Sequence, residues 1–263
     1  MGAFTIIADV FDVVVLVAAS IHLFSHVSET ERRSPAVMLG FAYTMQVVSN
    51  LYWIAHEIMT KEAIYEFSAI DVASAGFYIL FGASLAMVIG RRDKVEVRAL
   101  LGSGIVALVQ VAMWVVWAGS WFKNVLGGLP VWYATYYVIL AVRETHALPK
   151  AGRIALQLGV VAITVVQLCA GALDLPTETA SLLDTAGGLI CLAGVATIDI
   201  LLYRSWQAGF TAEKTLALAF LGVLWAWSSM FLMFEPLYSV FLIIAVVQMA
   251  FAGRAVTGWV EQR

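Results

Sequence analysis

Ionisable side chains gather where two apolar segments of the chain adjoin, in LYWIAHEIMTKEAIYEFSAIDVAS (51 to 74). His56 and Glu57 end the first segment, Asp71 opens the second, and Lys61 lies between them. A histidine beside a carboxylate can accept and pass on protons, which any site that oxidises a quinol must do. His56 and Asp71 are therefore candidates for such a site. The alternatives are an interfacial histidine without a role and an aspartate that caps the following helix.

Aromatic side chains form a second group, in GGLPVWYATYYVILA (127 to 141). Trp132 and Tyr133 follow Pro130 in this stretch. Aromatic residues commonly form a belt at the membrane–water interface, and this is the ordinary explanation for them. Flat apolar walls would also suit the headgroup of a quinone.

Aspartates within apolar segments are a third group. Asp9 and Asp12 are three residues apart, so they share one face of the first helix, where a cation or proton path is conceivable. An ionisable group inside a membrane helix costs roughly 2.5 to 3.5 kcal/mol on insertion scales, so each is a functional candidate by default. Asp184 and Asp199 lie in or near a later segment.

The elements that position these residues follow from composition. Hydrophobic residues make up 62% of the 263 residues, charged residues 13%, and the mean hydropathy is +0.90. Such values predict an all-α, polytopic membrane protein, in which each span needs about 20 mostly apolar residues. Segments of that kind lie at 3–24, 36–59, 68–90, 99–122, 125–142, 154–173, 182–203, 215–234 and 237–255. We therefore expect nine helices, and because only Glu235 and Pro236 separate the last two, an eight-helix arrangement stays open.

Basic residues predict the orientation, because cytoplasmic loops are enriched in them. Thirteen of the 15 Lys and Arg follow odd-numbered segments, and only Lys61 and Lys123 follow even-numbered ones. This split predicts a multi-pass protein of the cytoplasmic membrane, with its N-terminus outside and its C-terminus inside.

Several classes of function lack their motifs in the sequence. It holds no Gly-rich phosphate loop, no HExxH and no CxxC, and the formal net charge is -3. Nucleotide hydrolysis and nucleic-acid binding are therefore poorly supported, and we expect no haem and no metal site.

A weak internal repeat suggests how the helices group. A shift of 113 positions brings 68–92 onto 181–205, where Asp71 meets Asp184. The repeat predicts two four-helix bundles, 1–124 and 125–234, followed by a terminal helix and short tail at 235–263. The alternative is that apolar helices opening with Asp and closing with Arg simply look alike.

IDVASAGFYILFGA (70 to 83), preceded by a helix ending in His56 and followed by 127–141, resembles a known family. It is similar to the membrane anchor subunits of dimethyl sulfoxide reductase-type enzymes, in the broader NrfD and polysulfide reductase membrane-subunit group. The resemblance covers roughly residues 36 to 142 and rests on topology and residue types. The sequence departs from the family in having Asp where Glu is frequent, a short loop after His56, and nine helices where eight are usual.

The resemblance implies a subunit that binds and oxidises menaquinol without being the catalytic subunit. Electrons would pass to an iron-sulfur subunit and on to a molybdopterin subunit, in anaerobic respiration. His56 and Asp71 would take the quinol protons, Lys61 would add a basic group, and Trp132 and Tyr133 would border the site.

A reading from the transport class stays open beside this one. The two suspected bundles would then form an ion-coupled secondary carrier. Its candidate coupling-ion sites are Asp9, Asp12, Asp71, Asp184 and Asp199.

Overall fold

Seven α-helices account for nearly all of the chain that the structure, a computed structural model, describes. The described residues are 3–28, 33–60, 67–90, 95–118, 121–145, 177–206, 222 and 235–257. The helices are α1 (Ala3–Ser25), α2 (Arg33–Met59), α3 (Ala69–Ile89), α4 (Val97–Ala118), α5 (Trp121–Thr145), α7 (Thr177–Trp206) and α9 (Glu235–Thr257).

Each of these helices falls on one of the apolar segments expected from the sequence, so the all-α class is confirmed for the described residues. The expected sixth and eighth segments, 154–173 and 215–234, lie outside them except for Gly222. Two helices, Thr5–Ser25 and Ala69–Ile89, are long and apolar enough to cross a membrane.

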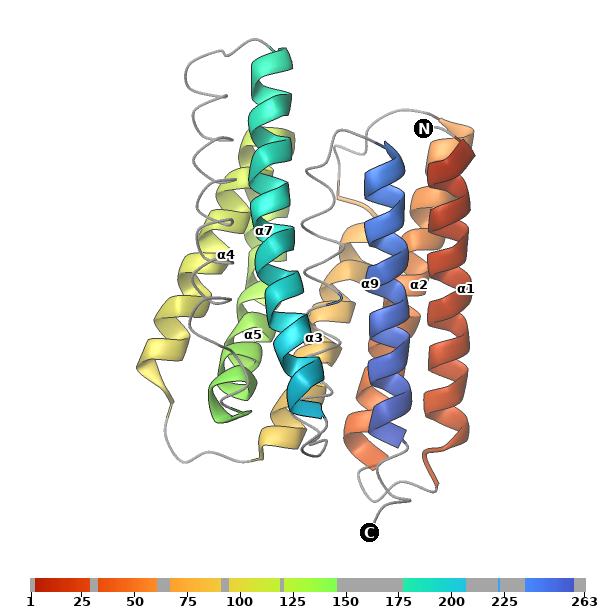
Figure 1. Cartoon of the computed structure of the whole chain (residues 1–263), viewed down its shortest axis with the longest axis vertical. Coiled ribbons are helices and arrows are strands. Elements are labelled where there is room, and N and C mark those ends of the chain that lie inside the picture. The colour runs from red at the N-terminus through yellow and green to blue at the C-terminus, as the bar shows by residue number, and fades with distance from the viewer. Residues whose placement is uncertain are drawn as a thin grey trace.

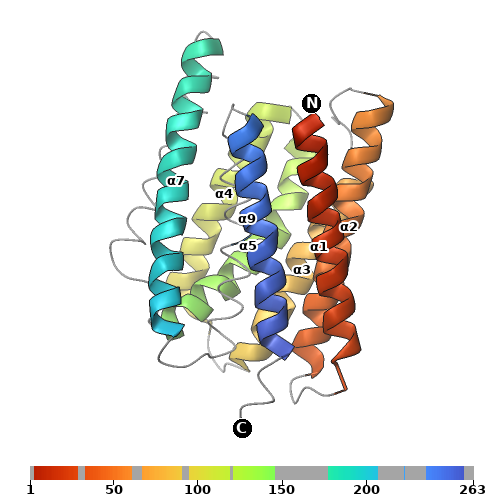
Figure 2. The same ribbon diagram turned by 45° about the vertical axis from the view of Figure 1, so that its right-hand side comes forward.

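The helices lie side by side along the long axis of the molecule, as Figure 1 and Figure 2 show. On one side of the structure α1 packs against both α2 and α9, and on the other side α5 packs against α3 and α4. The helices from α1 to α5 alternate in direction, so α2 ends and α3 begins at the same end of the bundle. By contrast α9 runs parallel to α1, since Tyr238 lies near Asp9 at one end and Gly253 lies against Leu23 at the other.

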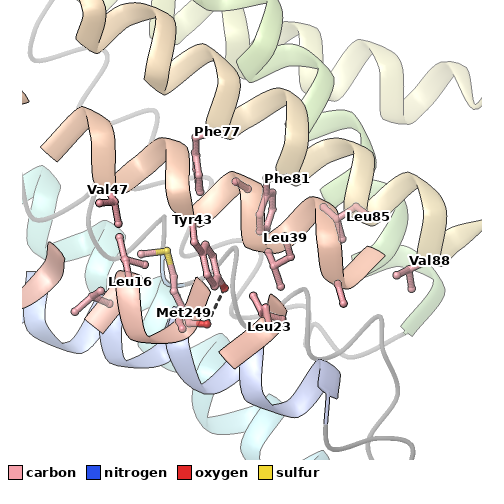
Figure 3. Close-up of a cluster of buried hydrophobic side chains, with 14 of the residues drawn as sticks. Leu16, Leu23, Leu39, Tyr43, Val47, Phe77, Phe81, Leu85, Val88 and Met249 are labelled. Carbon is pink, nitrogen blue, oxygen red and sulfur yellow. Dashed lines mark hydrogen bonds between the residues drawn. The ribbon is translucent and has the colours of Figure 1, made fainter. Parts of the chain in front are cut away.

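One apolar cluster joins α1, α2, α3, α5 and α9, and Figure 3 shows it around Tyr43. The Tyr43 side chain is fully buried, and its hydroxyl donates a hydrogen bond of 2.7 Å to the carbonyl of Met249 in α9. The cluster also contains Leu16, Leu23, Leu39, Phe77, Phe81, Leu85, Val138 and Val246. The hydrogen bond of Tyr43 joins α9 to α2, and α1 packs against both helices.

Polarity in α1 is the inverse of that in a helix on the surface of a soluble protein. Several of its aliphatic side chains face outward, with Ile7, Val14 and Ile21 about three-fifths exposed, whereas Asp9 and Asp12 face inward. Buried serines repeat the pattern in other helices, for example Ser84 in α3 and Ser103 in α4. An apolar exterior, with polar side chains placed inside, suits helices that lipid surrounds.

Candidate functional site

The inward face of α1 carries two aspartates that are almost inaccessible to solvent. Asp9 is 8% exposed and Asp12 is 5% exposed. Thr5, one turn before Asp9, is 2% exposed and shares this face, because residues 5, 9 and 12 follow the helical repeat. The apolar residues around them bring both carboxyl groups against α2 and α9.

Amide side chains of α2 hold one of the two carboxyl groups. Gln46 donates a hydrogen bond of 3.0 Å to the side-chain oxygen of Asn50, one turn further along α2. Asn50 in turn donates to Oδ2 of Asp12 across the α1–α2 interface. The other oxygen of Asp12, Oδ1, is buried and has no hydrogen-bond partner. The amide chain therefore orients the carboxyl group and leaves one of its oxygens available.

Two further titratable groups lie near this carboxyl pair. Glu57, half-buried in the last turn of α2, is close enough to Asp9 for their charges to interact. Tyr238, in the first turn of α9, is close to both aspartates. Asp9, Asp12, Asn50, Glu57 and Tyr238 thus form what we term the acidic site, enclosed by α1, α2 and α9.

The histidine expected to take quinol protons lies in the last turn of α2. His56 is half-buried and stacks on Tyr52, with ring centroids 6.3 Å apart and planes inclined by 22°. The Thr60 hydroxyl lies 3.1 Å from its Nδ1 and also donates to the His56 carbonyl at 2.9 Å. The imidazole is therefore held at the end of the helix.

The aspartate expected to share that site caps its own helix. Oδ2 of Asp71 accepts a hydrogen bond of 2.8 Å from the Ser68 backbone N–H and one of 3.1 Å from the Ser68 hydroxyl. These bonds form a capping box at the start of α3. The capping role weighed from the sequence is thus present, and the quinol role stays a prediction. His56 and Asp71 do lie at the same end of the molecule, because α2 and α3 pack antiparallel.

The two aromatic residues lie in the middle of α5. Trp132 donates from its indole to the Leu100 carbonyl of α4 at 3.2 Å. Tyr133 lies on Gly82 of α3, where a Cβ would come within 2.6 Å of its ring. Gly82 is eleven residues after Asp71, a rise of about 16 Å along the helix. The structure therefore does not bring these aromatics to His56 and Asp71, and Lys61 lies outside the described residues.

The partners of the aspartate pair were missed from the sequence. Gln46 and Asn50 are four residues apart in an apolar segment, so they share a helix face that a search for inward polar groups would have found. Tyr238 gave no such signal in the sequence, because it comes close to the two aspartates only through the packing of α9 against α1. A separate polar contact joins α9 to α7, where Gln248 donates to Oδ1 of Asp199 at 2.7 Å.

Among the described residues, no three His, Cys, Asp or Glu side chains converge in a group that could hold a metal ion. Comparison with family models, curated proteins and solved structures finds no match to this chain.

Proposed function

We propose that this chain is a multi-pass membrane protein that works as an ion-coupled carrier, and that the ion binds in the acidic site. The observation that carries the proposal is the burial of Asp9 and Asp12 within a helix long and apolar enough to cross a membrane. Carboxyl groups at such positions are costly, and they characterise ion and proton pathways.

The geometry favours ion binding over a purely structural role for these aspartates. Neither aspartate forms an ion pair with a basic side chain of the described residues, so none of these residues offsets their charge. The Asn50 amide satisfies only one oxygen of Asp12. A structural contact between α1 and α2 would be made as well by two amides, without the cost of a buried charge. Reversible binding of an ion explains why carboxyl groups, and not amides, lie at these positions.

The topology predicted from the sequence completes the proposal. The parallel directions of α1 and α9 support an odd number of spans, and the outward aliphatic face of α1 suits lipid contact. The chain would cross the cytoplasmic membrane nine times, with its N-terminus outside and its C-terminus inside.

Charge-displacement currents test the carrier without requiring its solute. The full chain is reconstituted into liposomes, adsorbed on a solid-supported membrane and exposed to jumps in the concentration of protons, Na⁺ or K⁺. We expect a transient current for one ion, lost in the Asp9→Asn and Asp12→Asn variants. Glu178→Gln, at an exposed position in the first turn of α7, is the matched control and should retain the current. Currents that all four proteins share, or that none shows, would contradict the proposal.

A second function, menaquinol oxidation for a reductase, is favoured by a different observation. His56 and Asp71 lie at one end of the α2–α3 pair, and Tyr52 provides a flat ring beside the imidazole. In this proposal His56 and Asp71 take the quinol protons and Lys61 adds a basic group beside them. Trp132 and Tyr133 border the quinol from a position deeper in the protein. The electrons leave to an iron-sulfur subunit and then to a molybdopterin subunit.

Titration of a menaquinol-analogue inhibitor tests this second function directly. Saturable binding to the purified protein, lost in His56→Ala and kept in Asp12→Asn, would support it. Binding that is absent, or indifferent to His56→Ala, would leave the carrier as the better account. Copurification with iron-sulfur and molybdopterin subunits is the second measurement.

A further inference from the structure

Asp9 and Asp12 are close neighbours of like charge. Residues three apart on a helix have Cβ atoms about 5 to 6 Å apart, and the charges of these two carboxyl groups interact. Asn50 adds a dipole, Tyr238 is an uncharged phenol when protonated, and Glu57 adds a third acid. Two carboxylates that share a buried site resist being ionised together, since each disfavours the charge of the other. One proton between them would relieve this repulsion.

The geometry of the available oxygens favours a proton over a metal cation. A hard cation takes about six oxygen ligands at once, whereas a proton needs one oxygen. Oδ1 of Asp12 is a buried carboxyl oxygen without a hydrogen-bond partner, and no group of three or more acidic or histidine side chains converges in the described residues. The acidic site therefore suits the smaller ligand.

An unpaired hydroxyl on the same face provides an independent sign that a ligand is accommodated here. Thr5 is 2% exposed and its Oγ1 has no hydrogen-bond partner. Helical side chains lean toward the N-terminus, so the Asp9 carboxyl group extends over the turn that carries Thr5. The face of α1 that carries both carboxyl groups therefore also holds a buried hydroxyl without a partner, which a ligand in the acidic site can satisfy.

Glu57 lies where a proton would enter. It is half-buried, in the last turn of α2, at the end of the bundle where α1 begins. Asp9 is the nearer of the two aspartates to that end along α1, and its charge interacts with that of Glu57. Burial increases from Glu57 to Asp9 to Asp12, so the three carboxyl groups lead from the helix end inward.

We infer that the coupling ion of the proposed carrier is a proton, held between Asp9 and Asp12 and exchanged with the aqueous phase through Glu57. The inference rests on the proposed function and adds the identity of the ion and its route. In the transfer, hydronium in the aqueous phase gives a proton to the Glu57 carboxylate and becomes water. The O–H of Glu57 then breaks as an O–H forms on Asp9, so Glu57 returns to the carboxylate. The same exchange passes the proton from Asp9 to Oδ1 of Asp12. No oxidant or other reactant takes part.

Infrared difference spectroscopy of the full chain in lipid tests the inference, because a protonated carboxyl group has a carbonyl band separate from that of a carboxylate. At neutral pH we expect such a band, insensitive to Na⁺ and K⁺, and lost in both Asp9→Asn and Asp12→Asn. Asn has the size of a protonated Asp and no charge, so both variants should fold, which circular dichroism verifies. Glu178→Gln, at an exposed position in the first turn of α7, is the control and should keep the band.

The route is tested by the rate at which this band shifts after transfer into heavy water. Glu57→Gln should retain the band and slow the shift several-fold, since its amide cannot relay a proton, whereas Glu57→Asp should restore much of the rate. An unchanged rate in Glu57→Gln would overturn the route.

Two other outcomes would separate the inference from the function beneath it. A band that Na⁺ or K⁺ removes at constant pH would overturn the proton and leave a cation-coupled carrier. If the band is absent or survives both aspartate substitutions, and the charge-displacement current is equally indifferent to them, the inference and the proposed carrier both fail.

Discussion

Asn50 of α2 donates its side-chain amide to Oδ2 of Asp12 in α1, across the interface between the two helices. Gln46 does not contact Asp12 in this chain of bonds. Its amide donates to the side-chain oxygen of Asn50 at 3.0 Å, and this bond determines which way the Asn50 amide nitrogen points. A polar chain of three residues therefore runs from α2 into the acidic site. The orientation of α1 against α2 therefore depends on a hydrogen bond to the Asp12 carboxyl group, whose charge can change.

Replacement of Asn50 by Ala should destabilise the protein. The substitution removes the hydrogen bond to a buried carboxyl group and leaves that group without a donor, at a cost of about 1 to 3 kcal/mol. The free energy of unfolding, measured in mixed micelles by titration with a denaturing detergent, gives the change. Thr44→Ala is the control, since the Thr44 hydroxyl bonds only to Gly40 in its own helix.

A double substitution in the same unfolding experiment tests whether Asn50 acts through its contact with Asp12. If Asn50 acts through Asp12, Asn50→Ala combined with Asp12→Asn should cost less than the sum of the two single substitutions. Additive costs would contradict the coupling.

The helices were predictable from the sequence because length and hydropathy determine where a span can lie. The α3 segment, expected at 68–90, is found at Ala69–Ile89 because Ser68 and Asp71 cap its start and Gly90, with φ of 82°, ends it. The neighbours of each helix were less predictable. Apolar residues surround α1, α3 and α9 on most sides, so the sequence does not mark which face meets which partner. The division into 1–124, 125–234 and 235–263 stays a prediction.

The site was predictable only in part, for a related reason. Asp9 and Asp12 were identified because charge within an apolar segment is costly and therefore informative. Their partners Asn50 and Tyr238 come from helices far along the chain, and only packing brings them to α1. Trp132 and Tyr133 were grouped with His56 by residue type, whereas their depth in α5 depends on how that helix lies against Gly82.

Substitution of Gly82 by Ala should loosen the contact between α3 and α5. A Cβ at this position would lie 2.6 Å from the Tyr133 ring and 3.1 Å from the Cα of Ala134, so a ring and a backbone would both have to move. Overpacking of this kind costs about 1 to 3 kcal/mol. Detergent-induced unfolding measures the change.

The matched control is Gly102→Ala, in α4. A Cβ there would meet only Ile139, at an ordinary distance of 3.6 Å. It should leave the free energy of unfolding unchanged or raise it, because Ala favours the helix. Equal losses for both variants would show that Gly82 is not a site of close approach.

Replacement of Tyr43 by Phe tests the connection between α2 and α9. The ring stays in the apolar cluster, but the 2.7 Å hydrogen bond to the Met249 carbonyl is lost. A cost of about 1 kcal/mol is expected, since one neutral hydrogen bond is removed and a buried carbonyl loses its side-chain donor. Tyr52→Phe is the control, because Tyr52 is 37% exposed and lies at the end of the bundle. A stability unchanged in Tyr43→Phe would show that the hydrogen bond does not stabilise the fold.

Ser68→Ala and Asp71→Asn together separate capping from chemistry at the start of α3. Ser68 donates from both its backbone and its hydroxyl to Oδ2 of Asp71, so either substitution weakens the capping box. Each should lower the stability by about 0.5 to 2 kcal/mol and speed amide hydrogen exchange in the first turn of α3. Ser68→Ala keeps the carboxylate of Asp71, whereas Asp71→Asn removes it.

The two variants differ in what they predict for a quinol site. If Asp71 only caps the helix, both should behave alike in inhibitor titration, because they share the same structural loss. If Asp71 also takes a quinol proton, Asp71→Asn should lose binding while Ser68→Ala retains it. Hydrogen exchange therefore reports the cap in both variants, and inhibitor affinity reports the charge in one of them.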